Sequence, residues 1–332
     1  MNGFSPFDSE SYPQRNVIYY EIREKEKREI KKLSLFAGSA VILYVVIQNG
    51  IFLAVELFGL LDLYKSNALF GAGTDILLTI LGVFLPFALM GAKMKKISGE
   101  KEPVLASAPK SFSLLILGAL GATGFIMVAN ILSSYITWFI SLFGFELTAP
   151  DIEMPEGFFG FFVSMLRISI LTAIVEEYSL RGHILGNLRK YGDMFAVVVS
   201  ASIFALMHGN LIQVPFAMLS GIALAIFTLK TKSIWPAIIA HAINNGLSVV
   251  ITYLIRIMGE DPAMTLYTIA IYGFIFMGII ASLIFALITK DVPLRKSESA
   301  LSASEKFKAF LLTPTTLVSL VIMVVITSAS VS

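Results

Sequence analysis

The stretch that decides the fold is "FFGFFVSMLRISILTAIVEEYSLRGHIL", residues 158–185. Its first eighteen residues carry one charge, Arg167, and two adjacent glutamates, an arginine and a histidine follow. At 1.5 Å per residue, an apolar run of this length is long enough to cross most of a bilayer core. The stretch therefore predicts a membrane helix that carries Glu176, Glu177 and Arg181 in its second half.

The composition of the whole chain agrees with a lipid environment. The 332 residues are 56% hydrophobic and 14% charged, and the mean hydropathy is +0.81, whereas about a quarter of a soluble domain is charged. The chain has no cysteine, which excludes disulfides, thiolate metal sites and cysteine nucleophiles. A net charge of +2 gives no indication of a nucleic-acid partner.

Apolar windows long enough to cross a membrane recur along the chain. They predict an all-α, polytopic transmembrane helix bundle of about eight to nine spans. The first window lies behind a polar arm and lacks a small-residue cleavage site, so we expect it to remain as an anchor. In the third window, "GALGATG" spaces small residues for close helix packing. The windows are 33–61, 75–92, 112–144, 158–188, 193–211, 213–229, 234–257, 264–289 and 312–330.

The distribution of lysine and arginine predicts the orientation. Twenty-one of these residues fall in the N-terminal arm and in alternate loops, and the opposite loops hold only Lys65 and Arg256. Because cytoplasmic loops carry the excess of positive charge, we expect a cytoplasmic N-terminus and a C-terminus on the other side. The arm "YYEIREKEKREIKK" is expected to be a helix that runs into the first span. We interpret its basic residues as a solvated topology signal, with contact to anionic lipid headgroups as the alternative.

The few ionisable groups inside these windows indicate a site. Each costs roughly 2.5–3.5 kcal/mol at a helix centre, so such groups are retained for a reason. Glu177 and Arg181 are four residues apart and share a helical face, which predicts an ion pair, while Glu176 points about 100° away and can face a cavity. The fifth and seventh windows add His208 in "FALMH" and His241 with Asn245 in "HAINN". At comparable depths, these three helices are expected to converge on one polar pocket.

This set of side chains suits hydrolysis. A carboxylate can take a proton from water, and imidazole can orient that water or protonate a leaving amine. An amide beside a second histidine can hold a developing oxyanion. The same glutamate and two histidines could instead bind a metal. The HExxH, GxSxG and GxGD patterns of other protease designs are absent from the sequence, which disfavours those chemistries.

Three motifs resemble a known family. "EEYSLR" (176–181) fits EExxxR, "FALMH" (204–208) fits FxxxH, and "HAINN" (241–245) fits HxxxN. In this order they are similar to the motifs of the CAAX protease and bacteriocin-processing family, also called the Abi family. The resemblance covers about residues 158–257. It implies a glutamate-dependent intramembrane endopeptidase without a cofactor or a metal.

The resemblance also implies a role for each matching residue. Glu176 would activate water, His208 would assist, and His241 with Asn245 would form the oxyanion site. The supporting residues would be Glu177, Arg181 and Phe204. The chain would then divide into a cytoplasmic basic arm (1–32), N-terminal transmembrane helices (33–157), a catalytic four-helix core (158–257) and C-terminal transmembrane helices (258–332). The expected location is the bacterial plasma membrane.

A second function class stays open. A non-proteolytic scaffold, a regulator or a transporter could use the same polar cluster for packing or ion binding, although no inverted repeat with broken helices favours a transporter. The expected partners are membrane lipid, a peptide or membrane-associated protein substrate and, as a possibility, a regulatory membrane protein. Two further residues are expected to be structural. His183, seven residues after Glu176 and hence on nearly the same helical face, is expected to be a hydrogen-bonded histidine near the interface, with a role at the mouth of the pocket as the alternative. Arg167 is expected to extend to the outer surface.

Overall fold

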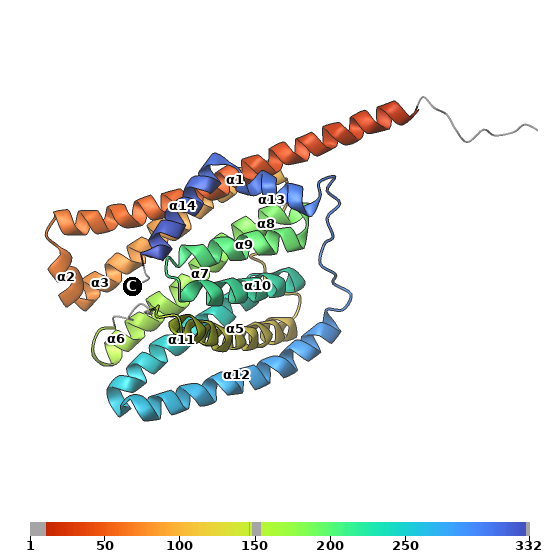
Figure 1. Cartoon of the computed structure of the whole chain (residues 1–332). Coiled ribbons are helices and arrows are strands. Elements are labelled where there is room, and N and C mark those ends of the chain that lie inside the picture. Colours follow the sequence, from red (N-terminus) through yellow and green to blue (C-terminus); the bar gives the residue numbers. More distant parts are fainter. Residues whose placement is uncertain (1–10, 146, 148–153, 330–332) are drawn as a thin grey trace, which may run out of the picture.

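The computed structural model describes residues 11–145, 147 and 154–329, and in this part of the chain the regular structure is entirely helical. The predicted all-α bundle is confirmed (Figure 1). The helices, including π-helical and 3₁₀ segments labelled η, are α1 (Ser11–Leu57), α2 (Leu61–Ser66), α3 (Ala68–Leu77), η1 (Leu78–Phe84), α4 (Leu85–Ser98), α5 (Phe112–Ser141), α6 (Gly157–Ser164), η2 (Met165–Leu171), α7 (Thr172–Glu177), η3 (Tyr178–Leu185), α8 (Gly186–Leu188), η4 (Arg189–Tyr191), α9 (Asp193–Met207), α10 (Gln213–Thr231), α11 (Trp235–Met258), α12 (Glu260–Ile288), α13 (Ala303–Leu311) and α14 (Pro314–Ser328).

Among its described residues, the structure has seven or eight candidate spans, against the eight to nine that the sequence predicts. In the described part of the chain, seven helical runs are long and apolar enough to cross a membrane, and the pair α13 and α14, bent by 77°, brings the number to eight. The remaining window became α9, which has 15 residues and is therefore about 22 Å long. This is short of the roughly 30 Å of a bilayer core. The chain thus leaves α9 through a loop part of the way across and returns along α10 (Figure 1).

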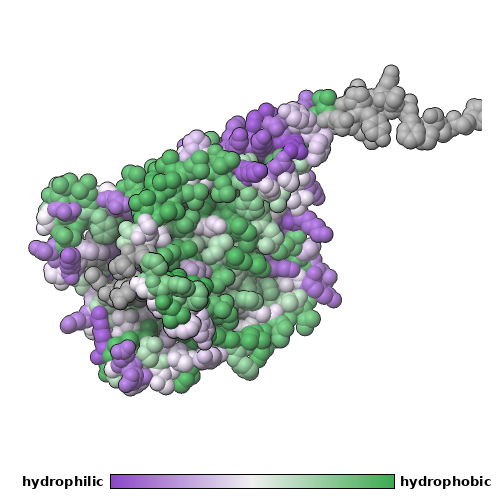
Figure 2. Space-filling view, viewed as in Figure 1, coloured by the Kyte–Doolittle hydropathy of each residue, from purple (hydrophilic) through white to green (hydrophobic). Residues whose placement is uncertain are grey.

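The bundle has two outer groups of helices with the core between them. On one side α1 packs along α4 and α14, and on the other side α5 packs between α10 and α12 (Figure 1). Hydrophobic residues cover the flank of the helices, and hydrophilic residues gather at the two ends of the bundle (Figure 2). This distribution is the one expected of a multi-pass membrane protein, in which the flank contacts lipid.

The small residues of α5 produce the close packing that the sequence predicted. A Cβ at Gly124 would lie 2.7 Å from the Cα of Gly278 on α12, and one at Gly121 would lie 2.8 Å from the ring of Phe227 on α10. Such distances are below van der Waals contact, so only glycine allows the helices to approach this far. Backbone contact of this kind stabilises membrane helix pairs by dispersion.

The N-terminal arm is a helix continuous with the first span, as predicted, but its carboxylates are bound to the protein. Glu29 accepts hydrogen bonds from Lys190 Nζ (2.9 Å) and Tyr191 Oη (2.7 Å). Glu26 accepts hydrogen bonds from Ser299 Oγ (2.7 Å) and the backbone N–H of Ala300 (2.9 Å). These contacts, which were not predicted from the sequence, fix the acidic face of the arm to the end of the bundle.

Candidate active site

The two adjacent glutamates lie at the end of α7, between two π-helical segments. The predicted span 158–188 is helical throughout, but η2 precedes α7 and η3 follows it. In a π-helix the backbone hydrogen bonds join residues i and i+5, and such segments are frequent at functional sites. The widened turns change the direction of every side chain after Glu177 relative to a regular α-helix.

Glu177 is the buried member of the pair. Its Oε1 lies 2.9 Å from Arg181 Nη1 and 2.9 Å from His241 Nδ1, and the side chains of Glu177 and Arg181 are 0% exposed. The carboxylate can only accept, so His241 donates its Nδ1–H to it. The ion pair with Arg181 was predicted from the four-residue spacing, whereas the hydrogen bond to His241 on α11 was not.

Phe204 lies at the centre of the cluster. Arg181 Cζ stands 4.3 Å from its ring centroid, within the range of a cation–π contact. The ring of His208 packs edge to face against it at 4.9 Å, and the ring of His241 does so at 5.7 Å. Phe204 is 3% exposed, so one buried aromatic ring fixes the relative positions of both histidines and the arginine.

His208 follows the last residue of α9. Its Nδ1 lies 2.8 Å from the carbonyl oxygen of Phe204. A carbonyl only accepts, so the proton is on Nδ1, and Nε2 of the neutral ring is free to accept a proton. Irregular backbone at membrane depth is tolerated where it lines a cavity with water. Because α9 ends early, the imidazole of His208 and the polar backbone that follows it lie at the same depth in the membrane.

Glu176 faces a cavity of about 470 Å³. Its side chain is 21% exposed, and its Oε2 lies 3.8 Å from His241 Nε2, which is too long for a hydrogen bond. The cavity has the size of a typical ligand site. The structure thus brings the four candidate catalytic residues, from α7, α11 and the end of α9, around one space: Glu176, His208, His241 and Asn245.

Asn245 belongs to a chain of three amides. Its Nδ2 donates to the carbonyl of Ile168 (3.2 Å), and its Oδ1 accepts from Asn244 Nδ2 (3.2 Å). Asn130 on α5 donates in turn to Asn244 Oδ1 (3.0 Å). Asn130 and Asn244 were not singled out from the sequence. The only feature of the sequence that could have indicated these two residues is a polar amide inside an apolar window.

Arg167 has a partner that was not predicted, and His183 differs from its predicted role. Arg167 forms an ion pair with Asp75 on α3, and both line a pocket with Lys65 and Arg256. His183 was predicted to be hydrogen-bonded, and this is wrong. It is 6% exposed, neither ring nitrogen has a hydrogen-bond partner among the described residues, and the ring packs edge to face on Tyr178 at 4.9 Å. The π-helical turns of η3 explain the change, because seven residues no longer bring His183 back to the face of Glu176.

We expect Gly91→Ala to destabilise the protein. A Cβ at Gly91 on α4 would overlap the imidazole of His183, and overpacking of this kind costs about 1–3 kcal/mol. The readout is the melting temperature in detergent. Gly91→Ala combined with His183→Ala should melt above Gly91→Ala alone, because the smaller side chain removes the overlap. An unchanged melting temperature for Gly91→Ala, or simple additivity in the double variant, would contradict this packing.

Comparison with known proteins supports the resemblance. Residues 158–247 match the family model described as type II CAAX prenyl endopeptidase Rce1-like, and all three motifs lie inside the match. No curated protein and no solved structure matches the chain. The chain therefore carries an Rce1-like domain at residues 158–247, which indicates an intramembrane endopeptidase of the CAAX-protease type in a multi-pass membrane protein.

Proposed function

We propose that this protein hydrolyses a peptide bond within the membrane and that Glu176 activates the attacking water. The observation that carries the proposal is the division between the two adjacent glutamates. Glu177 is completely buried and bound to Arg181 and His241, while Glu176 lies on the cavity wall beside two histidines. One carboxylate is thus held as a counter-charge, and the other is accessible to water and substrate.

The proposed reaction assigns one task to each side chain. Glu176 takes a proton from water as the hydroxide adds to the substrate carbonyl, and the proton then passes to the leaving amine. His208, whose Nε2 is the free nitrogen, orients the water. Asn245, which keeps one N–H of its amide, and His241 beside it form the site for the oxyanion. Glu177 keeps the His241 ring in place through Nδ1, which is the orienting role that carboxylates have in other acid–base sites.

The substrate class is a membrane-associated protein or peptide. The substrate types that the resemblance implies are prenylated CAAX tails, which the name of the matched family model includes, peptide pheromone precursors and bacteriocin leaders. The alternative function is a scaffold, a regulator or a transporter that uses the same polar cluster. A carboxylate that packs only as a structural group has no need of an open cavity with two imidazoles, which favours the peptidase.

The experiment that tests the function compares protein termini in cells. Cells with the intact protein and cells with Glu176→Gln are analysed by quantitative proteomics of new N- and C-termini. We expect a set of termini that forms only with the intact protein and that maps to membrane-associated proteins. If the two sets of termini are the same, the peptidase proposal fails and the scaffold or transporter class remains.

The topology and the division of the chain stay part of the proposal. With the basic loops in the cytoplasm, the N-terminal arm (1–32) and the loops that follow α4 and α10 face that side. The N-terminal helices (33–157), the catalytic core (158–257) and the C-terminal helices (258–332) would follow in this order across a bacterial plasma membrane. The basic residues of the arm would then be a solvated topology signal on that side, with contact to anionic lipid as the alternative.

We predict no stoichiometric zinc in the purified protein. Within the described residues, no group of three or more His, Asp and Glu side chains has the arrangement of a metal site, and no two histidines are four residues apart on one helix. Elemental analysis of the purified protein checks this. About one zinc per chain, lost together with activity on chelation, would make Glu176, His208 and His241 ligands and overturn the assignment.

A further inference from the structure

A second, smaller chamber lies behind Glu176. Its volume is about 130 Å³, enough for about four waters at roughly 30 Å³ each. It shares four lining residues with the larger cavity, so these side chains stand between the two spaces: Thr172, Glu176, Phe204 and His208. The other polar walls come from α1 and η1, outside the segment that matches the family model, through Tyr44, Gln48 and Thr79.

Most polar groups of this chamber can only accept hydrogen bonds. Three hydroxyls each donate to a backbone carbonyl: Tyr44 to Met207 (2.9 Å), Thr79 to Asp75 (2.9 Å) and Thr172 to Arg167 (2.9 Å). Each keeps only lone pairs for a water. The carboxylate of Glu176 and the Nε2 of neutral His208 are acceptors as well.

Gln48 supplies the missing donors. Among the described residues that line the chamber, it alone has N–H groups that are not used elsewhere in the protein. A water that gives its hydrogens to Glu176 and His208 needs a donor to its own oxygen, and the amide of Gln48 is that donor. Gly82 on η1 makes room for it, because a Cβ at this position would lie 2.9 Å from Gln48 Cγ.

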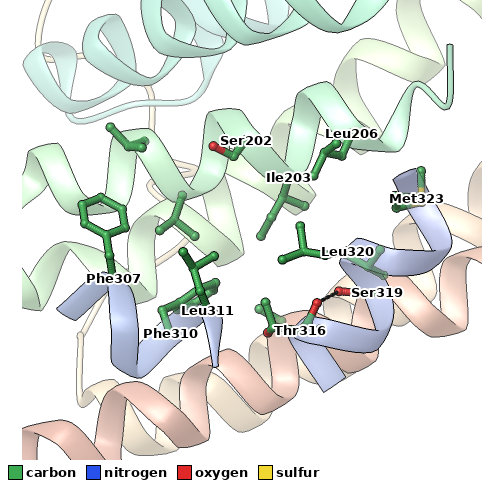
Figure 3. Close-up of a pocket in the computed structure, with 15 residues that line it drawn as sticks. Ser202, Ile203, Leu206, Phe307, Phe310, Leu311, Thr316, Ser319, Leu320 and Met323 are labelled. Atoms are coloured by element: carbon green, nitrogen blue, oxygen red, sulfur yellow. Dashed lines mark hydrogen bonds between the residues drawn. The ribbon is translucent and has the colours of Figure 1, made fainter. Parts of the chain in front are cut away.

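A cavity of similar size elsewhere in the bundle shows the contrast. It measures about 200 Å³ and lies between α1, α9, α13 and α14 (Figure 3). Its three hydroxyls each have a neighbouring acceptor: Ser319 donates to Thr316 O (2.9 Å), Thr316 to Ser34 O (3.2 Å) and Ser202 to the sulfur of Met218 (3.9 Å). The other walls are apolar, and Leu206, Leu320 and Met323 point into the space (Figure 3). Apolar cavities of this kind stay dry.

We propose that the chamber behind Glu176 stores the water of the reaction and that Gln48 is a positioning residue that orients the attacking water toward Glu176. This inference rests on the proposed peptidase function. Tyr44 contributes indirectly, since its hydroxyl fixes the carbonyl of Met207, the residue before His208. The N-terminal helices are then part of the catalytic unit and not only an anchor.

The presence of water is tested without any substrate. The full chain in lipid nanodiscs is exposed to X-rays, so that hydroxyl radicals formed from bound water oxidise nearby side chains, and the modified peptides are measured by mass spectrometry. We expect Met207, which lines the chamber, to be oxidised several-fold faster than Met323, which lines the dry cavity. Equal rates at the two methionines would overturn the proposal of a water-filled chamber.

The role of Gln48 is tested by kinetics on a synthetic peptide that spans a site cut in the comparison of termini. Gln48→Leu and Gln48→Glu both remove the amide donors, and each should lower kcat about tenfold, the worth of one hydrogen bond, with KM unchanged. Asn49→Leu is the matched control, because this neighbouring amide is exposed and bonds to Val45 O of its own helix (2.8 Å). It should leave both constants at the parent values.

Each failure has a separate meaning. Parental kcat in both Gln48 variants would overturn the positioning role even if the chamber is wet. A fall in activity that follows a fall in melting temperature would also overturn it, because a structural role explains that result. Oxidised Met207 in a protein that produces no new termini would support the chamber and reject the peptidase function.

Discussion

Glu176→Gln abolishes peptide cleavage, with a loss of roughly 10²-fold or more, while the purified protein keeps a melting temperature at or above that of the parent. The loss follows from the assigned proton transfer, which contributes at least this factor to a rate. The stability follows from the environment, since the Glu176 side chain is partly exposed to a cavity and Glu177 holds the ion pair. A neutral amide at this depth removes a charge from a medium that disfavours it.

His208→Ala should produce a similar loss, because it removes the free Nε2 beside Glu176. The measurements are cleavage rate and melting temperature in one detergent. Glu56→Gln is the matched control, because it removes a carboxylate from an exposed position at the end of α1, and it should leave both quantities unchanged. Parental activity in Glu176→Gln would reject the assignment of the base.

Glu177→Gln and Arg181→Gln should have the opposite profile, with a large loss of stability. Both side chains are 0% exposed and form a 2.9 Å ion pair. Removing one member of a buried pair leaves the other charge without compensation and typically costs about 3–5 kcal/mol. Arg181→Gln also removes the cation from the face of Phe204. We expect lower melting temperatures and lower yields, with activity falling in parallel.

Glu177→Gln retains an oxygen that can accept the Nδ1–H of His241, so the fraction that folds should keep some activity. Arg295→Gln is the control for stability, since its 2.7 Å pair with Glu100 lies at the surface and such pairs contribute about 0–1 kcal/mol. If Glu176→Gln unfolds the protein while Glu177→Gln is stable and inactive, the roles of the two glutamates are reversed and the motif is read one residue out of register.

Much of the fold could be predicted because a lipid environment restricts the choices. Among the described residues, each apolar window is helical over most of its length, and the spacing of "GALGATG" predicted the close contact of α5 with its neighbours. The ion pair of Glu177 with Arg181 followed from a four-residue step on one helix. These features depend on local sequence, in which hydrophobicity and helical spacing are enough.

The remaining features depend on partners far away in the sequence or on departures from α-helical geometry. The hydrogen bond from His241 to Glu177 joins α11 to α7, and the ion pair of Arg167 with Asp75 joins η2 to α3. The π-helical turns moved His183 away from its expected face. The early end of α9, which places His208 in a loop, has a signal in Gly209 (φ +60°) and Asn210, but the prediction followed the apolar window through it. Tertiary packing decides each of these.

The most direct test of the central claim follows the oxygen of the attacking water. The intact protein cleaves its peptide in water enriched in ¹⁸O, and mass spectrometry measures the label in the new C-terminal carboxylate and in the protein segment that contains Glu176. If Glu176 acts as a base on water, each product carries one ¹⁸O after the first turnover and Glu176 stays unlabelled after many. Label in the Glu176 carboxylate, or a first product without label, would show a covalent intermediate on the glutamate and contradict the account.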